Sequence, residues 1–210
     1  MNRPSRRDWV EVGATVLLAL AAVATAWSSY QATRWNGEQA KAAASVNKTR
    51  IEAARASDLA NAQQQVDVAT FTAWVDSYAR GEATLVSFYR TRFREEFKPA
   101  FEAWIETKPL KTPGAPLTPF AMPEYQLQAK TEADRLDATA EALSAQVRRN
   151  IQRGSNYVLG VVLFAVALFF AGMSTKLTAP GLRATMLAIG CLLFLGTAVW
   201  IATFPVSVAV

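Results

Sequence analysis

Histidine is absent from this 210-residue sequence, and cysteine occurs only once, at Cys191. A chain without histidine cannot build a Ser-His-Asp triad, a Cys-His pair or a Cys/His zinc site. A single cysteine also excludes a disulfide within the chain. No arrangement of carboxylates suggests acid–base chemistry either. We therefore predict that the protein is not an enzyme and that it has no catalytic residue, no metal site and no cofactor.

Charge is missing from two long stretches of the C-terminal part. Residues 157–175 and 184–210 contain no Asp, Glu, Lys or Arg. A helix rises 1.5 Å per residue, so about 20 apolar residues cross the ~30 Å hydrocarbon core of a membrane. A third apolar run follows a basic tail near the N-terminus. We predict a tail over 1–8 and transmembrane helices over 9–30, 157–174 and 182–206, the last two forming a hairpin.

The N-terminal apolar run has a second interpretation. Its basic tail and the sequence Ala24-Thr25-Ala26 match a secretory signal peptide with a small-residue cleavage site. The helical pattern, however, continues through these three residues. We therefore favour a membrane-spanning helix.

Basic residues outnumber acidic ones, with 22 Lys and Arg against 17 Asp and Glu. The surplus lies mainly beside the apolar runs, whereas the region 31–156 is nearly balanced. A nearly balanced domain lacks the basic surface that binds nucleic acid, so we predict no nucleic-acid partner. We expect contacts with lipid head groups from Arg3, Arg6, Arg7, Arg148, Arg149 and Arg153.

Small side chains follow one face of the first apolar run. Their steps of four and three residues place them on one side of a helix. Small residues let helices approach closely in lipid, where the hydrophobic effect does not hold helices together. We predict helix–helix packing, within the chain or between the subunits of a homo-oligomer, at Thr15, Ala19, Ala22, Ala26, Ser29, Gly190 and Gly196.

The region 31–156 contains good helix formers and predicts a long helical stalk. We expect helices over about 31–64, 66–107 and 124–156, with a proline-rich loop over 108–123. Ala and Leu recur along the last helix at close to heptad spacing, which is typical of a coiled coil. Because no proline or glycine interrupts the chain near Gln65, an unbroken first helix that continues past Arg80 is the alternative.

Aromatic residues recur at helical spacing between Phe71 and Trp104. We interpret them as the core of the stalk. A pocket for a lipid or small ligand is the alternative, and it would require an apolar cavity near these rings.

The orientation in the membrane follows from the basic residues of the short segments. The N-terminal tail and the turn containing Lys176 and Arg183 lie on one side of the membrane, and short basic segments stay in the cytoplasm. This predicts a cytoplasmic N-terminus and an extracytoplasmic stalk. Arg34, Arg148, Arg149 and Arg153 flank the other side, so the opposite orientation remains open.

The sequence Trp27-Ser28-Ser29-Tyr30-Gln31-Ala32 closes the first apolar run, and an Ala/Gln-rich helix and a terminal hairpin follow it. This layout resembles a group of uncharacterised bacterial inner-membrane proteins, which implies that location and no activity. The order of one span, a helical domain and two spans is also similar to the ExbB/TolQ/MotA stator family. The hairpin lacks that family's proline-bearing, threonine-lined polar spans, so a proton-driven motor is not implied.

Together these patterns predict an all-α membrane protein of three transmembrane helices and a coiled-coil-like stalk. We expect a homo-oligomer that mediates assembly or contact with a protein partner. A homo-oligomeric ion channel or pore and a lipid or small-ligand sensor are the alternatives.

Overall fold

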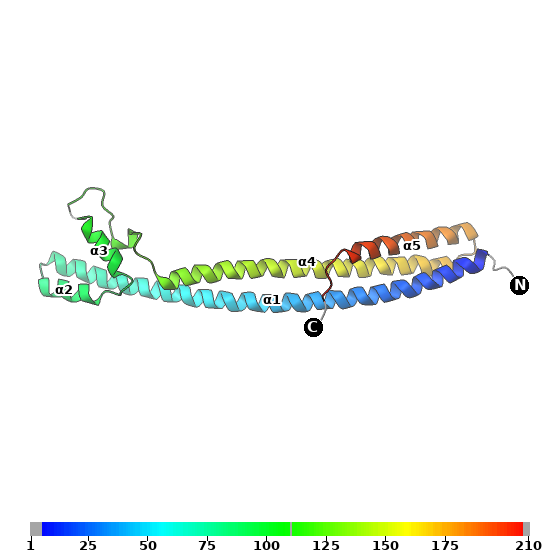
Figure 1. The fold of residues 1–210 in the computed structure, drawn as a ribbon, viewed down its shortest axis with the longest axis horizontal. Coiled ribbons are helices and arrows are strands. Elements are labelled where there is room, and N and C mark those ends of the chain that lie inside the picture. Colours follow the sequence, from blue (N-terminus) through cyan, green and yellow to red (C-terminus); the bar gives the residue numbers. More distant parts are fainter. Residues whose placement is uncertain (1–5, 110, 208–210) are drawn as a thin grey trace. The chain divides into compact units, whose positions relative to one another are not determined.

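The computed structural model describes residues 6–109 and 111–207. Its helices are α1 (Arg6–Ala79), α2 (Ala83–Arg92), α3 (Lys98–Glu106), α4 (Gln128–Lys176) and α5 (Pro180–Ala202), and a 3₁₀ turn, η1 (Pro119–Ala121), lies between α3 and α4 (Figure 1). No strand occurs in these two ranges. The predicted all-α fold is confirmed.

Three of these helices can cross a membrane. By length and composition, α1, α4 and α5 each contain a sufficiently long apolar stretch. The prediction of a membrane protein with three candidate spans is therefore confirmed at this level. The helix expected to end at Val206 ends at Ala202, and the segment that follows contains Pro205, which cannot donate a helical hydrogen bond.

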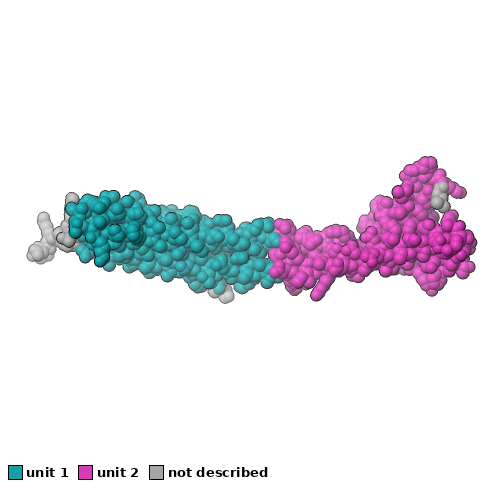
Figure 2. Space-filling model, turned by 180° about the vertical axis from the view of Figure 1, so that it is seen from behind, with its two compact units in different colours: residues 1–44, 143–210 teal, residues 45–142 magenta. Residues whose placement is uncertain are grey.

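The chain forms two compact units, shown in different colours in Figure 2. Unit 1 comprises residues 1–44 and 143–210, and unit 2 comprises residues 45–142. Each unit contains one part of α1 and one part of α4. The predicted apolar spans all lie in unit 1.

In unit 1, α1 and α4 run antiparallel. A Cβ added at Gly154 of α4 would lie 3.6 Å from Cβ of Trp35, and one added at Gly160 would lie 3.8 Å from Oγ of Ser28. Residue numbers therefore fall along α1 as they rise along α4. Glycine at these positions removes the side chain that would otherwise separate the two helices.

Helix α5 completes this three-helix arrangement (Figure 1). A Cβ at Gly190 would lie 3.3 Å from the carbonyl oxygen of Ala167 in α4 and 3.3 Å from Leu17 in α1. At the other end of α5, Ile201 packs against Gly160. A core cluster of buried residues lies beside these contacts and comprises Ala32, Trp35, Tyr157, Phe164 and Ile201.

In unit 2, α1 and α4 lie side by side (Figure 1), and each has small buried residues. Val46, Ala53 and Ala60 are buried at seven-residue intervals on α1, and Ala133 and Ala140 are buried at the same interval on α4. The larger apolar side chains Ile51 and Leu59 are exposed on other faces of α1. Alanine inside and longer side chains outside allow the two helices to approach closely.

The break predicted near Gln65 does not occur, and α1 continues to Ala79. The alternative of an unbroken helix is closer to the structure, although that helix stops just before Arg80. The turn falls at Gly81, whose φ of +73° belongs to the left-handed region that glycine adopts without a steric penalty. Helix propensity alone gave no reason for a break at Gln65, and α1 is continuous there.

The single helix predicted over 66–107 is also wrong, because this segment forms the end of α1, all of α2 and all of α3. Pro99 lies in the first turn of α3, where the missing N–H of proline costs nothing. The following connection is longer than expected and includes η1, so α4 begins at Gln128 rather than at residue 124.

Candidate functional site

Unit 2 contains a core of aromatic rings, which we call the aromatic cluster. Its buried members come from α1, from α3 and from the segment between α2 and α3. They are Phe71, Trp74, Phe93, Phe97, Phe101 and Trp104. Phe71 lies at the centre and makes edge-to-face contacts with Trp104 at 5.3 Å and with Phe120 at 5.7 Å. Such contacts favour a single arrangement of rings. The interpretation of these residues as a core is confirmed.

A buried ionic contact lies beside the aromatic cluster. The Asp67 side chain is fully buried, and its Oδ2 accepts hydrogen bonds from Arg94 Nη1 at 2.8 Å and from the Tyr125 hydroxyl at 3.1 Å. Arg94 also pairs with Glu96. Glu96 Oε1 in turn accepts a hydrogen bond from the backbone N–H of Gln128, at the start of α4.

Burial sets the protonation behaviour of this contact. Loss of hydration raises the pKa of Asp67 above its usual range, although the nearby Arg94 charge and the Tyr125 hydrogen bond act in the opposite direction. Burial and the neighbouring Asp67 carboxylate raise the pKa of Tyr125. Each of these side chains is held by its neighbours, so the contact fixes the segment after α2 against α1.

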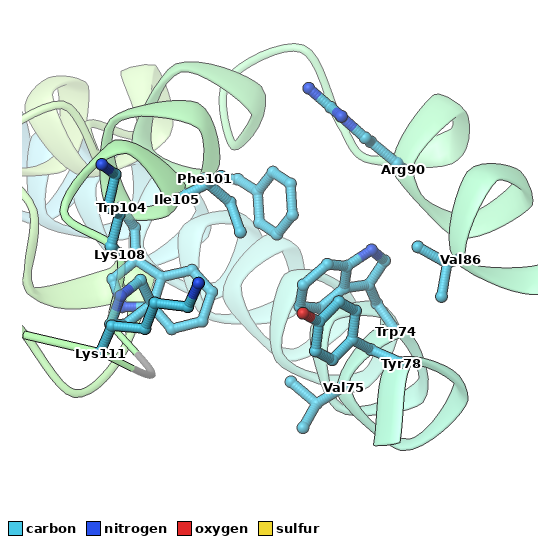
Figure 3. A pocket seen from close by; sticks show the side chains of 11 residues that line it. Trp74, Val75, Tyr78, Val86, Arg90, Phe101, Trp104, Ile105, Lys108 and Lys111 are labelled. Carbon is cyan, nitrogen blue, oxygen red and sulfur yellow. The ribbon is translucent and has the colours of Figure 1, made fainter. Parts of the chain in front are cut away.

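A cavity of about 470 Å³, which we call the aromatic pocket, opens between the end of α1, α2, α3 and the loop after α3 (Figure 3). It is lined by Trp74, Val75, Tyr78, Val86, Arg90, Phe101, Trp104, Ile105, Lys108, Pro109 and Lys111. The sequence-based alternative required an apolar cavity near these rings, and this pocket meets that requirement. The cluster itself is filled, so the cavity lies beside the core and not within it.

The charged groups of the aromatic pocket are all basic. Arg90 donates hydrogen bonds from Nε and Nη2 to the Glu102 carboxylate at 3.0 and 2.6 Å, so its charge is already neutralised. Within residues 6–109 and 111–207, Lys108 and Lys111 form no ion pair, and no carboxylate lines the cavity. The free positive charge is therefore at the loop side of the pocket.

The loop holds these lysines through its own backbone. Lys108 has a φ of 52°, and its carbonyl oxygen accepts hydrogen bonds from the N–H groups of Lys111 at 2.8 Å and Thr112 at 3.0 Å. The ring N–H of Trp104 donates to the carbonyl oxygen of Pro116 at 2.8 Å. These bonds place Lys108 and Lys111 beside the rings that line the cavity.

Trp74 contributes a buried donor that lacks an acceptor. Its side chain is only 6 % exposed, and its Nε1 has no hydrogen-bond partner in the part of the chain that the structure describes. Figure 3 shows this nitrogen on the side of Arg90 and Val86. An unsatisfied buried donor costs about 1–3 kcal/mol.

The residues predicted for helix packing do not behave alike. Thr15, Ala19, Ala22, Ala26 and Ser29 are all exposed, so they make no tight contact within the chain. Gly190 is buried against α1 and α4, whereas a Cβ added at Gly196 would meet nothing within 4 Å. The helix face that α1 uses within the chain carries different residues, namely Ala14, Leu17, Ala21, Ser28 and Gln31.

The residues predicted for head-group contact are only partly described. Arg3 lies outside the described residues, and the side chains of Arg6 and Arg7 are not described either. Arg148 and Arg149 are exposed on α4. Arg153 places its guanidinium over the ring of Trp35 at 4.6 Å, so part of its binding capacity is used within the protein.

Comparisons of the chain with protein-family models, with curated proteins and with solved structures find no match. Function is therefore inferred here from the contacts, burial and charge of these residues.

Sequence reasoning missed two contacts in unit 1. Arg183 is buried at the start of α5 and lies 3.5 Å from the Glu11 carboxylate, although it was interpreted only as a flanking charge. Gln31 is fully buried and bonds to Ser207. The only available signal was that each is a polar residue at the end of an apolar run.

Proposed function

We propose that this chain is a non-enzymatic, homo-oligomeric integral membrane protein that serves as a scaffold for assembly or for contact with a protein partner. The observation that carries the proposal is a face of α1 that consists of small residues and is covered by no other helix among the described residues. We infer that a second subunit packs against this face.

The face is longer than the predicted stripe. After Ser29 it continues through Thr33, Gly37, Ala40 and Ala44, which are also exposed and follow the same steps of three and four residues. From Thr15 to Ala44 this is roughly 44 Å of helix at 1.5 Å per residue. A Cβ added at Gly37 would meet nothing within 4 Å. A partner helix could therefore approach closely along this whole length.

The chemistry of the face suits contact with another helix. Thr15 donates its hydroxyl to the Glu11 carbonyl at 2.9 Å, and Thr33 donates to the Ser29 carbonyl at 3.1 Å. These two hydroxyl protons are satisfied within α1, so close packing does not leave either threonine donor unpaired. By contrast, neighbouring faces of α1 expose larger side chains such as Val16 and Val23, which are suited to lipid.

The helical region contributes a second element of the proposed scaffold. The seven-residue spacing of Ala53 and Ala60 on α1 and of Ala133 and Ala140 on α4 supports antiparallel pairing of coiled-coil type in unit 2. The exposed Ile51, Leu59 and Val66 leave apolar side chains available for a partner.

We place the protein in the bacterial inner membrane, with a cytoplasmic N-terminus and an extracytoplasmic region 31–156. The layout of spans and the basic residues of the short segments support this orientation. The contact between Glu11 and Arg183 also supports a common side for the N-terminal tail and the turn between α4 and α5.

Native mass spectrometry in mild detergent tests the oligomer. We expect a defined multimer for the unmodified chain and dissociation of the Ala19→Leu/Ala26→Leu variant, because two leucines would hold the subunits apart. Ala165→Leu/Ala188→Leu is the matched control, since both alanines are exposed on the other two spans. A monomeric unmodified chain with its helical content intact, or equal behaviour of the two variants, would contradict the proposal.

A further inference from the structure

We propose that the aromatic pocket binds a single-chain amphiphile, meaning an apolar chain that ends in an anionic carboxylate or phosphate head group. The site lies wholly within unit 2, so it is independent of the subunit contact on the apolar part of α1.

The walls of the pocket determine the apolar part of the ligand. Trp74, Phe101 and Trp104 present ring surface from α1 and α3, and Ile105 adds an aliphatic side chain. The volume of about 470 Å³ falls in the range of ~300–1,000 Å³ that is usual for small-molecule sites. A small inorganic anion would leave these walls without contacts, whereas a hydrocarbon chain would fill them.

The rim determines the head group and the orientation. Lys108 and Lys111 lie on one side of the pocket and Arg90 on the other (Figure 3). Because Glu102 neutralises Arg90, the two lysines offer the available positive charge. We therefore place the anionic group at the loop and the chain against Trp74 and Phe101.

The backbone at Lys108 supports a functional reason for this residue. Lys108 is the only non-glycine residue with a positive φ among the described residues, and it directly follows Thr107, the C-cap residue of α3. Glycine is the usual residue at such a position because other side chains are strained there. A lysine here is explained by a positive charge that the pocket uses.

Fluorine NMR of the full chain in nanodiscs of zwitterionic lipid can test the site. Labelling with 5-fluorotryptophan gives one signal for each of the 6 tryptophans, and single Trp→Phe variants assign them. The probes are decanoate, decyl phosphate and uncharged decanol, all below their micelle-forming concentrations. We expect saturable shifts of the Trp74 and Trp104 signals with one or both anions.

Two variants distinguish the contribution of the lysine charges to binding from the contribution of the apolar cavity. We expect Lys108→Gln/Lys111→Gln to weaken binding of the anions on the order of tenfold, with little change for decanol. Lys48→Gln/Lys130→Gln is the matched control, since it removes the same charge elsewhere in unit 2 and should leave binding unchanged. Val75→Phe adds bulk at the half-exposed wall and should weaken all three probes.

Lys108→Gly tests whether weaker anion binding occurs without any loss of stability. It relieves the backbone at φ 52°, so unit 2 should unfold at the same or a higher urea concentration while the anions bind more weakly. Tighter binding of decanoate or of decyl phosphate would assign the head group within the proposed class. Shifts confined to the tryptophans of unit 1, equal affinity for decanol and the anions, or full affinity in Lys108→Gln/Lys111→Gln would overturn the proposal.

Discussion

Gln31 and Ser207 exchange two hydrogen bonds although they lie 176 residues apart. The Ser207 N–H donates to Gln31 Oε1 at 3.0 Å, and Gln31 Nε2 donates to the Ser207 carbonyl oxygen at 3.4 Å. The buried Gln31 side chain thus satisfies the backbone N–H and carbonyl groups of Ser207, in the segment that follows α5. This contact joins the exit of the third span to the exit of the first.

We expect Gln31→Leu to release this segment. Leucine has a similar size but cannot bond to Ser207, so residues 203–207 should lose about 1 kcal/mol of local stability. Hydrogen-exchange mass spectrometry should show faster exchange there and unchanged exchange in unit 2. Gln65→Leu, at an exposed position of the same helix, is the control. Unchanged protection of residues 203–207 in Gln31→Leu would show that the contact does not hold the segment.

Gly190 and Gly196 should respond differently to the same substitution. Gly190→Leu would force its side chain into the backbone of Ala167 and Ala171 and into Leu17, because a Cβ at residue 190 already lies 3.3–3.4 Å from them. We expect a loss of roughly 1–3 kcal/mol or more, seen as dissociation of the spans at lower SDS concentration. Gly196→Leu should have little effect on folding, since nothing lies within 4 Å. Equal sensitivity of the two variants would contradict the observed packing.

Arg94→Met should destabilise unit 2 strongly. It would leave the Asp67 carboxylate buried without its cation, which typically costs about 3–5 kcal/mol. Asp67→Asn in the same chain should recover part of the loss, because a neutral amide carries no charge to solvate. Urea unfolding followed through the fluorotryptophan signals of Trp74 and Trp104 measures both variants. Additive effects of the two substitutions would show that Asp67 and Arg94 do not interact.

The raised pKa of Asp67 predicts how the stability of unit 2 changes with pH. In the folded state this carboxyl holds its proton above the ordinary value of 3.8, so the folded state binds more protons than the unfolded state in that window. The stabilising contribution of Asp67 is therefore complete below 3.8 and is lost as the pH rises through the raised pKa. Arg94, Tyr125 and Glu96 are the titratable or charged groups that face it.

Asp67→Asn should remove this component of the pH dependence, because asparagine does not titrate. The same urea unfolding, repeated between pH 4 and pH 7, should then show a smaller fall of stability with rising pH. Asp134→Asn, at an exposed position of α4, should keep the slope of the unmodified chain. A slope that is identical in Asp67→Asn and in the unmodified chain would exclude Asp67 as its source.

The orientation of the protein in the membrane can be tested with single-cysteine variants, because Cys191 is the one cysteine in the sequence. In a Cys191→Ala background, Leu117→Cys places a thiol at a loop position that is 92 % exposed in unit 2. A membrane-impermeant maleimide should label it in intact cells. Thr178→Cys, in the exposed turn between α4 and α5, should react only after lysis. The opposite labelling pattern would place unit 2 in the cytoplasm.

Sequence patterns predicted the helical class and the spans well because each depends on local chemistry. An apolar run of sufficient length predicts a candidate membrane helix whatever its neighbours are. Helix boundaries were less accurate. Gly81 is the local signal for the turn, because glycine commonly follows the end of a helix, yet we placed the break near Gln65, where no such signal exists.

The candidate site shows the same division. The aromatic residues identified a core, but Lys108 and Lys111 belong to a loop that is far from Trp74 in sequence, so only folding brings them to one cavity. The buried partner of Arg94, Asp67, lies 27 positions away in the sequence. No spacing rule connects such a pair.

The sequence by itself determined that this protein is helical and that three of its segments are apolar enough to enter a membrane, because helix propensity and apolar length are properties of neighbouring residues. Tertiary structure decided which face of each helix is used. It buried Ala14 and Ala21 while leaving Ala19 and Ala22 exposed, and it distinguished Gly190 from Gly196. Faces of similar composition compete for the same contact, and only the fit of one helix against another selects between them.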